Sequence, residues 1–154
     1  METREYYMNI ALGMAREAFS HEEVPVGCVI VSPDGEILAR ERNRCRERND
    51  ATAHAELLAI QEAERVLGSS HLEGCSLYVT LEPCPMCVGA IVHTRISQII
   101  FGLPEPATGC CGSVINLFEE RLGHRPAIYS GVCAGESQSL LNGFFKGLRH
   151  EAEH

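Results

Sequence analysis

The sequence predicts an α/β fold with three layers, α/β/α, in which helices cover both faces of a five-stranded mixed sheet. Two observations carry this prediction. Segments with the apolar spacing of amphipathic helices alternate along the chain with short strands rich in β-branched residues. A helical segment also separates the last two strands, and a helical crossover makes the strands that it joins parallel. With 154 residues the chain can bury its own core, and we expect a single domain over residues 1–154.

The first half of the chain predicts a helix, a hairpin and a second helix. Residues 4–19 carry apolar side chains at the i, i+3 and i+4 positions of a helix with one buried face. Residues 26–31 and 37–40 form the strands of a hairpin. We expect Thr52 to cap a helix that carries His54 on its first turn and ends at Gly68. The inward side chains of this helix are predicted to be Leu57, Leu58, Ile60, Ala63, Val66 and Leu67.

The second half predicts three more strands and three more helices. Apolar residues alternate over residues 77–81 as in a strand, which Pro83 ends before a helix that starts at Cys84. Further strands are expected at residues 96–101 and 127–130, joined by a crossover helix over residues 113–122. The final helix is predicted near residues 136–151. It is expected to bury Leu140, Leu141, Phe144, Phe145 and Leu148.

The composition indicates a globular protein of the cytoplasm. Hydrophobic residues make up 45% of the chain and charged residues 22%, and the formal net charge is −8. Residues 1–5 include three charges and no apolar stretch reaches membrane-spanning length, so we expect no signal peptide and no membrane partner. In this setting the eight cysteines are expected to be buried small hydrophobes or metal ligands. Cys28 and Cys75 are expected to have no chemical role.

Two short runs, His54-Ala55-Glu56 and Pro83-Cys84-Pro85-Met86-Cys87, form the most informative pattern in the sequence. One imidazole and two thiolates give three protein ligands, the number found in a catalytic zinc site whose fourth position is open to water. Both cysteines stand at a predicted helix N-terminus, which favours the thiolate form that zinc binds. Glu56 is not needed as a ligand and could move the protons of that water. A His-x-Glu run followed by Pro-Cys-x-x-Cys is typical of zinc deaminases that act on nucleobases.

Another class of protein is compatible with part of this pattern. A Cys-x-x-Cys pair alone also occurs in redox proteins and in structural zinc sites. Cys110, Cys111 and Cys133 could supply the missing ligands of such a site. The combination of both runs, each at the start of a predicted helix, favours the catalytic zinc site.

Arginines recur at every second position from Arg40 to Arg48, directly before His54. If this stretch is extended, its arginines project to one side and form a strip that could contact the phosphates of a nucleic acid. The alternative, given equal weight, is a solvated loop in which Glu41 and Glu47 offset the arginines.

Segments over nearly the whole chain resemble the cytidine and deoxycytidylate deaminase superfamily, and within it the bacterial tRNA-specific adenosine deaminases. The matching segments are residues 23–27, Asn43, residues 50–56, residues 78–87, Phe101-Gly102, Gly112-Ser113, His124-Arg125 and Phe144-Phe145. Guanine-type deaminases of free bases are similar in the zinc motif itself. The flanking segments, residues 23–27 and the phenylalanine pair, are similar specifically to the tRNA enzymes.

The resemblance implies a cytidine-deaminase-like fold and deamination of adenosine to inosine at the wobble position of tRNA, with the anticodon stem-loop as partner. It implies that one zinc ion per chain is bound by His54, Cys84 and Cys87, and that Glu56 shuttles protons. It further implies a homodimer with the helix after Cys87 and residues 91–96 at the interface, and with a substrate groove shared between the subunits. By the same resemblance, the residues that contact the substrate are Val26, Asn43, Ala55, Pro83, Phe144 and Phe145. From the sequence alone, Asn43 could equally be a turn residue, and one of the phenylalanines is expected only to pack in the core.

The sequence also departs from the tRNA enzymes near the expected substrate. Glu105 and Ala107 stand where these enzymes usually carry an aspartate and a lysine, and Gly123 replaces a common asparagine. The chain ends in an acidic rather than a basic segment. An alternative function is therefore the deamination of a free nucleobase or nucleoside of the guanine or cytosine type.

Overall fold

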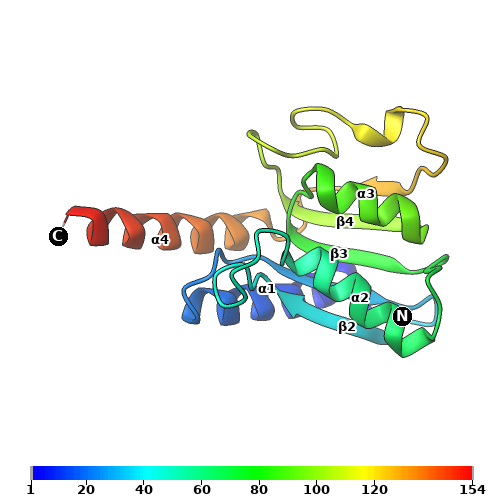
Figure 1. Ribbon diagram of the computed structural model, residues 1–154, viewed down its shortest axis with the longest axis horizontal. Coiled ribbons are helices and arrows are strands. Elements are labelled where there is room, and N and C mark those ends of the chain that lie inside the picture. Colours follow the sequence, from blue (N-terminus) through cyan, green and yellow to red (C-terminus); the bar gives the residue numbers. More distant parts are fainter. Residues whose placement is uncertain (1, 154) are drawn as a thin grey trace.

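The computed structural model describes residues 2–153 of the chain, and the side-chain surroundings of residues 2–148. Its sheet has the strand order β2-β1-β3-β4-β5 (Figure 1). The strands are β1 (Gly27–Val31), β2 (Ile37–Arg42), β3 (Ser76–Leu81), β4 (Gln98–Leu103) and β5 (Ala127–Tyr129). β1 is antiparallel to β2 and to β3, whereas β3, β4 and β5 run parallel. The mixed sheet and its parallel last strands are as predicted.

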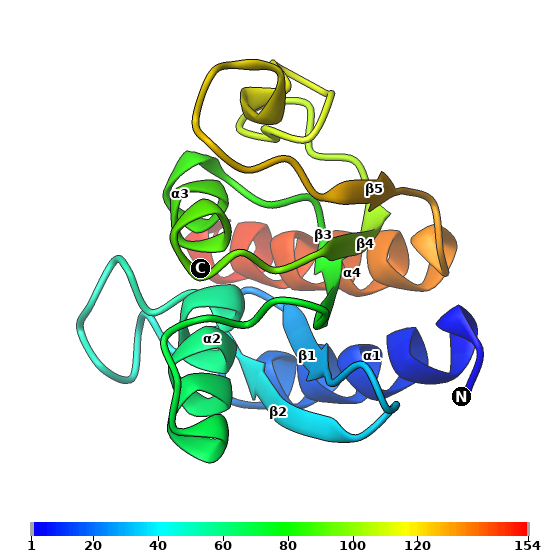
Figure 2. The same ribbon diagram turned by 90° about the vertical axis from the view of Figure 1, so that its right-hand side faces the viewer.

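Helices cover both faces of this sheet (Figure 2). The helices are α1 (Arg4–Ser20) and α4 (Ala134–Glu153) on one face, and α2 (Ala55–Leu67) and α3 (Pro85–Thr94) on the other. Ile30 and Leu77 belong to the core cluster under α2 and α3, and Val29 and Tyr78 to the cluster under α1. Because both faces are covered, β1 is buried along its whole length. The prediction of three layers is confirmed.

The start of α2 differs from the prediction. His54 is the N-cap, with extended backbone (φ −74°, ψ 149°), and the first helical residue is Ala55. Thr52 is not the cap, because its hydroxyl and its N–H both donate to the carboxylate of Asp50. Gly68 ends the helix as predicted, in the left-handed conformation (φ 64°) that glycine adopts without strain. Val66 and Leu67 were predicted to point inward, but the last turn of α2 extends past the core and exposes both.

The predicted crossover helix over residues 113–122 is wrong. The segment between β4 and β5 contains only a short 3₁₀ turn, η1 (Leu117–Glu119). The Asn116 side chain accepts a hydrogen bond from the N–H of Phe118, and this local bond replaces the helical pattern. Of the apolar residues expected on one helical face, Phe118 is buried but Val114 and Leu122 are exposed. The strands are parallel nevertheless, because the long connection carries the chain back to the end of the sheet where β4 begins, so that Ala127 pairs with Gln98.

The final helix is confirmed in type but not in burial. Leu141 is buried, whereas Phe145 and Leu148 are exposed. Figure 1 shows the reason: α4 continues well past the sheet, so that its C-terminal half has no neighbouring layer to cover it. No helix within residues 2–153 is long and apolar enough to cross a membrane.

Candidate metal centre and substrate pocket

Two helix starts bring the three predicted metal ligands together. His54 is the N-cap of α2, Cys84 is the N-cap of α3, and Cys87 lies in the first turn of α3. Nδ1 of His54 lies 3.6 Å from the sulfur of Cys84 and 3.6 Å from that of Cys87. The three donor atoms all lie within 4.8 Å of one another. The α2 and α3 N-termini therefore converge on one point, as the sequence predicts.

This donor set fits a zinc ion. Tetrahedral zinc with Zn–N of about 2.0–2.1 Å and Zn–S of about 2.3 Å places nitrogen and sulfur donors about 3.5 Å apart. The His54 to cysteine separations match that value. Within residues 2–153, these three side chains form the only such group of histidine, cysteine and carboxylate donors. Cys110, Cys111 and Cys133 do not join it, so the residues described supply the three ligands of a catalytic site rather than the four of a structural one.

The two thiols of the site differ in acidity. The pKa of Cys84 is lowered to about 4, chiefly because the thiol of Cys87 donates a hydrogen bond to it, with a further contribution from His54. The same bond, together with burial, raises the pKa of Cys87 well above its usual value. The shared hydrogen bond thus favours the thiolate form of Cys84, and a bound cation would favour the thiolate form of both cysteines.

Glu56 lies beside the ligands without being one of them. It is the second residue of α2 and only 4% exposed. Burial is the main cause that raises the pKa of its carboxyl group. A carboxyl group with a raised pKa can both accept and return a proton near neutral pH, which suits general acid–base chemistry.

A pocket of about 200 Å³ opens above the ligands. It is smaller than the roughly 300–1,000 Å³ typical of sites for drug-sized ligands, so it suits a single ring system. Its lining residues are Val24, Val26, Asn43, Cys45, His54, Glu56, Leu81, Glu82, Cys84 and Thr108. The predicted Val26 and Asn43 thus lie with the metal ligands. The sequence analysis did not predict Cys45 and Thr108, because both lie on loops that only the tertiary fold brings to the pocket.

The amide of Asn43 has a fixed orientation in this pocket. Its Oδ1 accepts the N–H of Ala55, the first helical residue of α2, at 2.8 Å. Its Nδ2 makes no hydrogen bond to the part of the chain that the structure describes, so this donor is the amide atom free to meet a ligand. Asn43 is therefore more than a turn residue: its side chain accepts the first N–H of α2 and offers a free donor to the pocket.

The other predicted contact residues lie outside the pocket lining. Ala55 and Pro83 are buried, each next in sequence to a ligand, and the carbonyl of Pro83 accepts the N–H of Cys110 at 3.0 Å. Phe144 lines a second hollow with Phe19 and Arg46, and its ring packs edge-on against Phe145. Because Cys45 lines the pocket and its neighbour Arg46 lines the second hollow, the two hollows adjoin along one loop.

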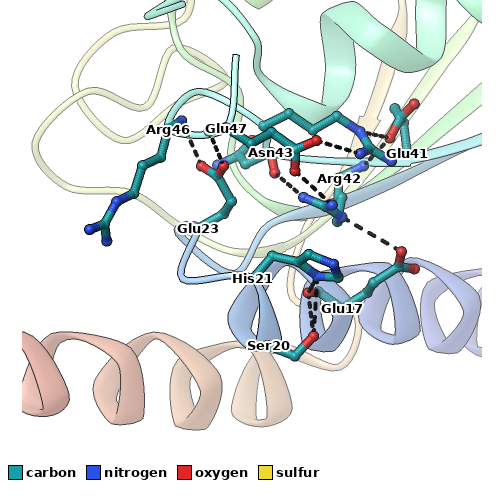
Figure 3. Close-up of polar contacts among 10 residues, drawn as sticks. Glu17, Ser20, His21, Glu23, Glu41, Arg42, Asn43, Arg46 and Glu47 are labelled. Carbon is teal, nitrogen blue, oxygen red and sulfur yellow. Dashed lines mark hydrogen bonds and ion pairs between the residues drawn. The ribbon is translucent and has the colours of Figure 1, made fainter. Parts of the chain in front are cut away.

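Arg42 is the centre of the network that holds this loop (Figure 3). Its guanidinium is buried and donates to the carbonyl of Asn43 at 3.0 Å. It also pairs with Glu47 at 2.8 Å and lies 3.7 Å from Glu17 of α1. The end of β2 is therefore tied to α1 and to the loop that carries Asn43.

The arginines before His54 do not form a strip. The chain leaves β2 at Arg42 and turns, so the alternating residues no longer share one side. Arg44 pairs with Glu41 at 2.8 Å and with Glu47 at 3.0 Å. The interpretation as a loop in which glutamates offset the arginines is confirmed for these residues. Arg46 is exposed, lies 3.6 Å from Glu22 and lines the second hollow together with it.

Two buried glutamates that do not bind the metal fix the loops on either side of the pocket. Glu23 accepts the N–H groups of Arg46 and Glu47 at 2.9 and 2.7 Å. Glu82 accepts three N–H groups and a hydroxyl from residues 105–113. Burial alone would raise the pKa of Glu82, but these hydrogen bonds, that of Ser113 first, outweigh it and leave the pKa below its usual value. The sequence analysis did not identify either glutamate as a structural anchor.

The chain matches known proteins over nearly its whole length. The model of the cytidine and deoxycytidylate deaminase zinc-binding region matches residues 1–103. The tRNA-specific adenosine deaminase of Bacillus subtilis is 45% identical over 150 residues, which are 97% of this chain and 92% of that protein. A solved structure from work on A-to-I editing by tRNA:A34 deaminases at the wobble position superposes with a TM-score of 0.85 at 44% identity, covering 88% of this chain and 99% of the other.

Some relatives are much longer than this chain. The tRNA(Ile)-lysidine synthase of Deinococcus radiodurans is 46% identical over 145 residues, which are 94% of this chain but 25% of that protein. The chain thus spans about a quarter of the length of this relative. Because the family model covers more than half of the chain, and the match to the Bacillus subtilis protein covers 92% of that protein, the chain belongs to the zinc-binding cytidine and deoxycytidylate deaminase family, alongside the tRNA-specific adenosine deaminases.

Proposed function

We propose that this protein deaminates adenosine to inosine at the wobble position of tRNA. One observation carries the proposal: a buried carboxyl group, Glu56, that is not a ligand lies beside a three-donor zinc site at the bottom of a pocket sized for one base. The hydrolysis consumes one water and releases ammonia. Relatives named as tRNA-specific adenosine deaminases support the choice of substrate.

Each residue of the pocket has its own role in this reaction. Zinc held by His54, Cys84 and Cys87 would supply a Lewis acid that makes a water molecule acidic near neutral pH. Glu56 takes one proton from the attacking water and delivers it to N1 of the adenine ring. It then takes the second proton from the new hydroxyl on C6 and passes it to the amino group, which leaves as ammonia. Asn43 donates its free amide N–H to an acceptor of the base. Val26 packs against the ring.

The surroundings of the pocket support a polynucleotide rather than a free base. A target base in RNA must leave its stack to reach such a pocket, and its neighbours then need stacking partners. The adjoining hollow offers the ring of Phe144, the half-exposed ring of Phe19 and the guanidinium of Arg46. Exposed aromatic rings beside a cation are typical of single-stranded nucleic-acid contacts. We therefore place the nucleotides that flank the reacting adenosine over this hollow, with Phe145 at its rim.

The pocket lining also favours adenine over guanine. Guanine carries an amino group at C2 and a proton on N1, and both need acceptors in a site that selects it. The carboxylates in the described lining are Glu56 and Glu82, and the oxygens of Glu82 already accept four hydrogen bonds. Glu56 is engaged in proton transfer. The free amide N–H of Asn43 can meet a ring nitrogen of either purine, so the preference for adenine rests on the missing acceptors.

Product analysis tests the proposal. The zinc-loaded protein is incubated with an anticodon stem-loop that carries adenosine at the wobble position, and in parallel with free adenosine, guanine and cytosine. Inosine in the stem-loop together with equimolar ammonia is expected. Glu56→Gln should keep zinc but lose at least about 10²–10⁴-fold in kcat, the usual contribution of a general acid–base group. Efficient conversion of guanine or cytosine, with the stem-loop untouched, would establish the free-base alternative.

We propose further that the chain acts in the cytoplasm as a homodimer of single-domain subunits that share the substrate groove. Ile91 and Ile96 of the expected interface are fully buried in the core of their own subunit. A contact with a second copy would therefore use Val92, His93 and Arg95, which are at least partly exposed. Sedimentation equilibrium of the zinc-loaded protein tests this, and a monomer at micromolar concentration would contradict it.

A further inference from the structure

Glu82 is a buried carboxylate that the deamination chemistry does not use. It is 3% exposed and stands directly after β3, two residues before the zinc ligand Cys84. Its carboxylate accepts the N–H of Glu105 at 3.0 Å, that of Cys111 at 2.9 Å and that of Ser113 at 3.1 Å. The hydroxyl of Ser113 also donates to it. With four donors bound, the carboxylate cannot serve as a ligand or a base.

The donors all come from the loop that begins after β4, which we call the covering loop (residues 104–116). Thr108 of this loop lines the pocket. Gly109 lies so close to Glu82 that a Cβ at this position would overlap with its carboxylate. The carbonyl of Pro83 accepts the N–H of Cys110 at 3.0 Å, which adds a backbone tie next to the carboxylate. The segment that leads into Cys84 and Cys87 therefore also fixes the part of the pocket wall that Thr108 provides.

We propose that Glu82 is a positioning residue that holds the covering loop over the pocket, and that the affinity for the substrate polynucleotide depends on it. The proposal rests on the proposed tRNA function, since the bound substrate polynucleotide is what would meet Thr108 and the covering loop. Glu82 supports binding rather than chemistry, because its four partners all lie in the covering loop, whereas the zinc ligands and Glu56 stand at the starts of α2 and α3. A carboxylate is required because all four partners are donors, and an amide in its place would turn one NH₂ group towards them.

The test compares Glu82→Gln with Glu23→Gln, which removes the matching buried carboxylate of the opposite loop. Hydrogen exchange is followed by mass spectrometry in residues 104–113 and in residues 43–49. Glu82→Gln should speed exchange only in residues 104–113, and Glu23→Gln only in residues 43–49. Zinc content should remain one per chain in both. For the wobble stem-loop, Glu82→Gln should raise KM at least about tenfold, equivalent to one charge-assisted hydrogen bond, with kcat within about twofold.

A milder variant keeps the test decisive if Glu82→Gln folds poorly. Ser113→Ala removes only the hydroxyl donor and should raise KM by about threefold. Unchanged exchange in residues 104–113, or a fall in kcat and zinc content at constant KM, would overturn the proposal. Hydrogen exchange is measured without substrate. A wild-type protein that leaves the stem-loop unconverted would therefore refute the proposed function, whereas the exchange rates would still decide whether Glu82 holds the covering loop.

Discussion

Asn43 joins two tasks that substitution can separate. Its Oδ1 accepts the N–H of Ala55 at the start of α2, and its Nδ2 is free to donate to the substrate base. Asn43→Asp keeps an acceptor for Ala55 but replaces the donor with a second acceptor. Asn43→Ala removes both. Because the side chain is only 8% exposed, water cannot readily replace either interaction.

Asn43→Ala should be the less stable of the two variants, whereas Asn43→Asp should be the less active. Asn43→Ala leaves a helix N-terminal N–H without its partner, which costs about 1–2 kcal/mol. This corresponds to a fall in Tm of about 2–8 °C for a chain of this size. Asn43→Asp should stay within about 1 kcal/mol of wild type, since a carboxylate at a helix N-terminus is favourable. In kcat/KM, Asn43→Ala should lose about tenfold, and Asn43→Asp at least about a hundredfold, because two acceptors would face each other.

The stabilities of the variants are measured by thermal unfolding monitored with circular dichroism. Their activities are measured by steady-state kinetics on the wobble stem-loop. Zinc content serves as the control and should be one per chain in all three proteins. The reasoning fails if Asn43→Asp is more active than Asn43→Ala, since the free amide N–H would then not face the base. It also fails if Asn43→Ala is as stable as wild type, since the bond to Ala55 would then contribute nothing.

Three further outcomes follow from the same geometry. Cys84→Ser should lose zinc, whereas Cys133→Ser should retain one ion per chain; metal analysis showing loss in the second variant would return a structural site to consideration. Gly27→Ala should lower the free energy of unfolding in urea by at least about 3 kcal/mol, because a Cβ there would meet the nitrogen of Ala15 at 2.7 Å and overlap with the carbonyl of Ala11 in α1. Gly13→Ala is the control: nothing lies within 4 Å of the new Cβ, so this variant should stabilise α1 by up to about 1 kcal/mol. Since the folded-state pKa of Glu82 is lowered, its stabilising effect is present above the unfolded pKa and is lost as pH falls through the folded one. The difference in unfolding free energy between wild type and Glu82→Gln should therefore shrink as pH falls from about 6 to below 4, and a constant difference would contradict the assigned hydrogen bonds.

The zinc ligands could be predicted from the sequence because their arrangement is mostly local. Cys84 and Cys87 are three residues apart at a helix start, where such side chains meet. His54 could be placed with them because two βα units of a parallel or mixed sheet direct their helix N-termini to the same edge. The strand count and the layers follow in the same way from the alternation of apolar patterns.

The pocket walls could not be predicted because they depend on contacts between distant segments. Glu82 reads as a linker between a strand and a helix, yet its partners lie 23 to 31 residues further along the chain. The arginine strip assumed an extended chain, but the loop turns after Arg42, and Asn49 even adopts a positive φ of 49°. For α4, the apolar spacing identified the face of the helix correctly. It contained no information on whether another element covers that face at Phe145.

The separation between helix starts and loops has an evolutionary consequence. The zinc ligands and Glu56 belong to α2 and α3, whereas Cys45 and Thr108 stand on loops that single buried glutamates anchor. Insertions or replacements in those loops can change which base, or which neighbouring nucleotides, the pocket accepts without disturbing the metal chemistry. The same zinc region is described for cytidine and deoxycytidylate, while relatives of this chain are named for adenosine in tRNA. A change of substrate in this architecture requires new loops around an unaltered reaction centre.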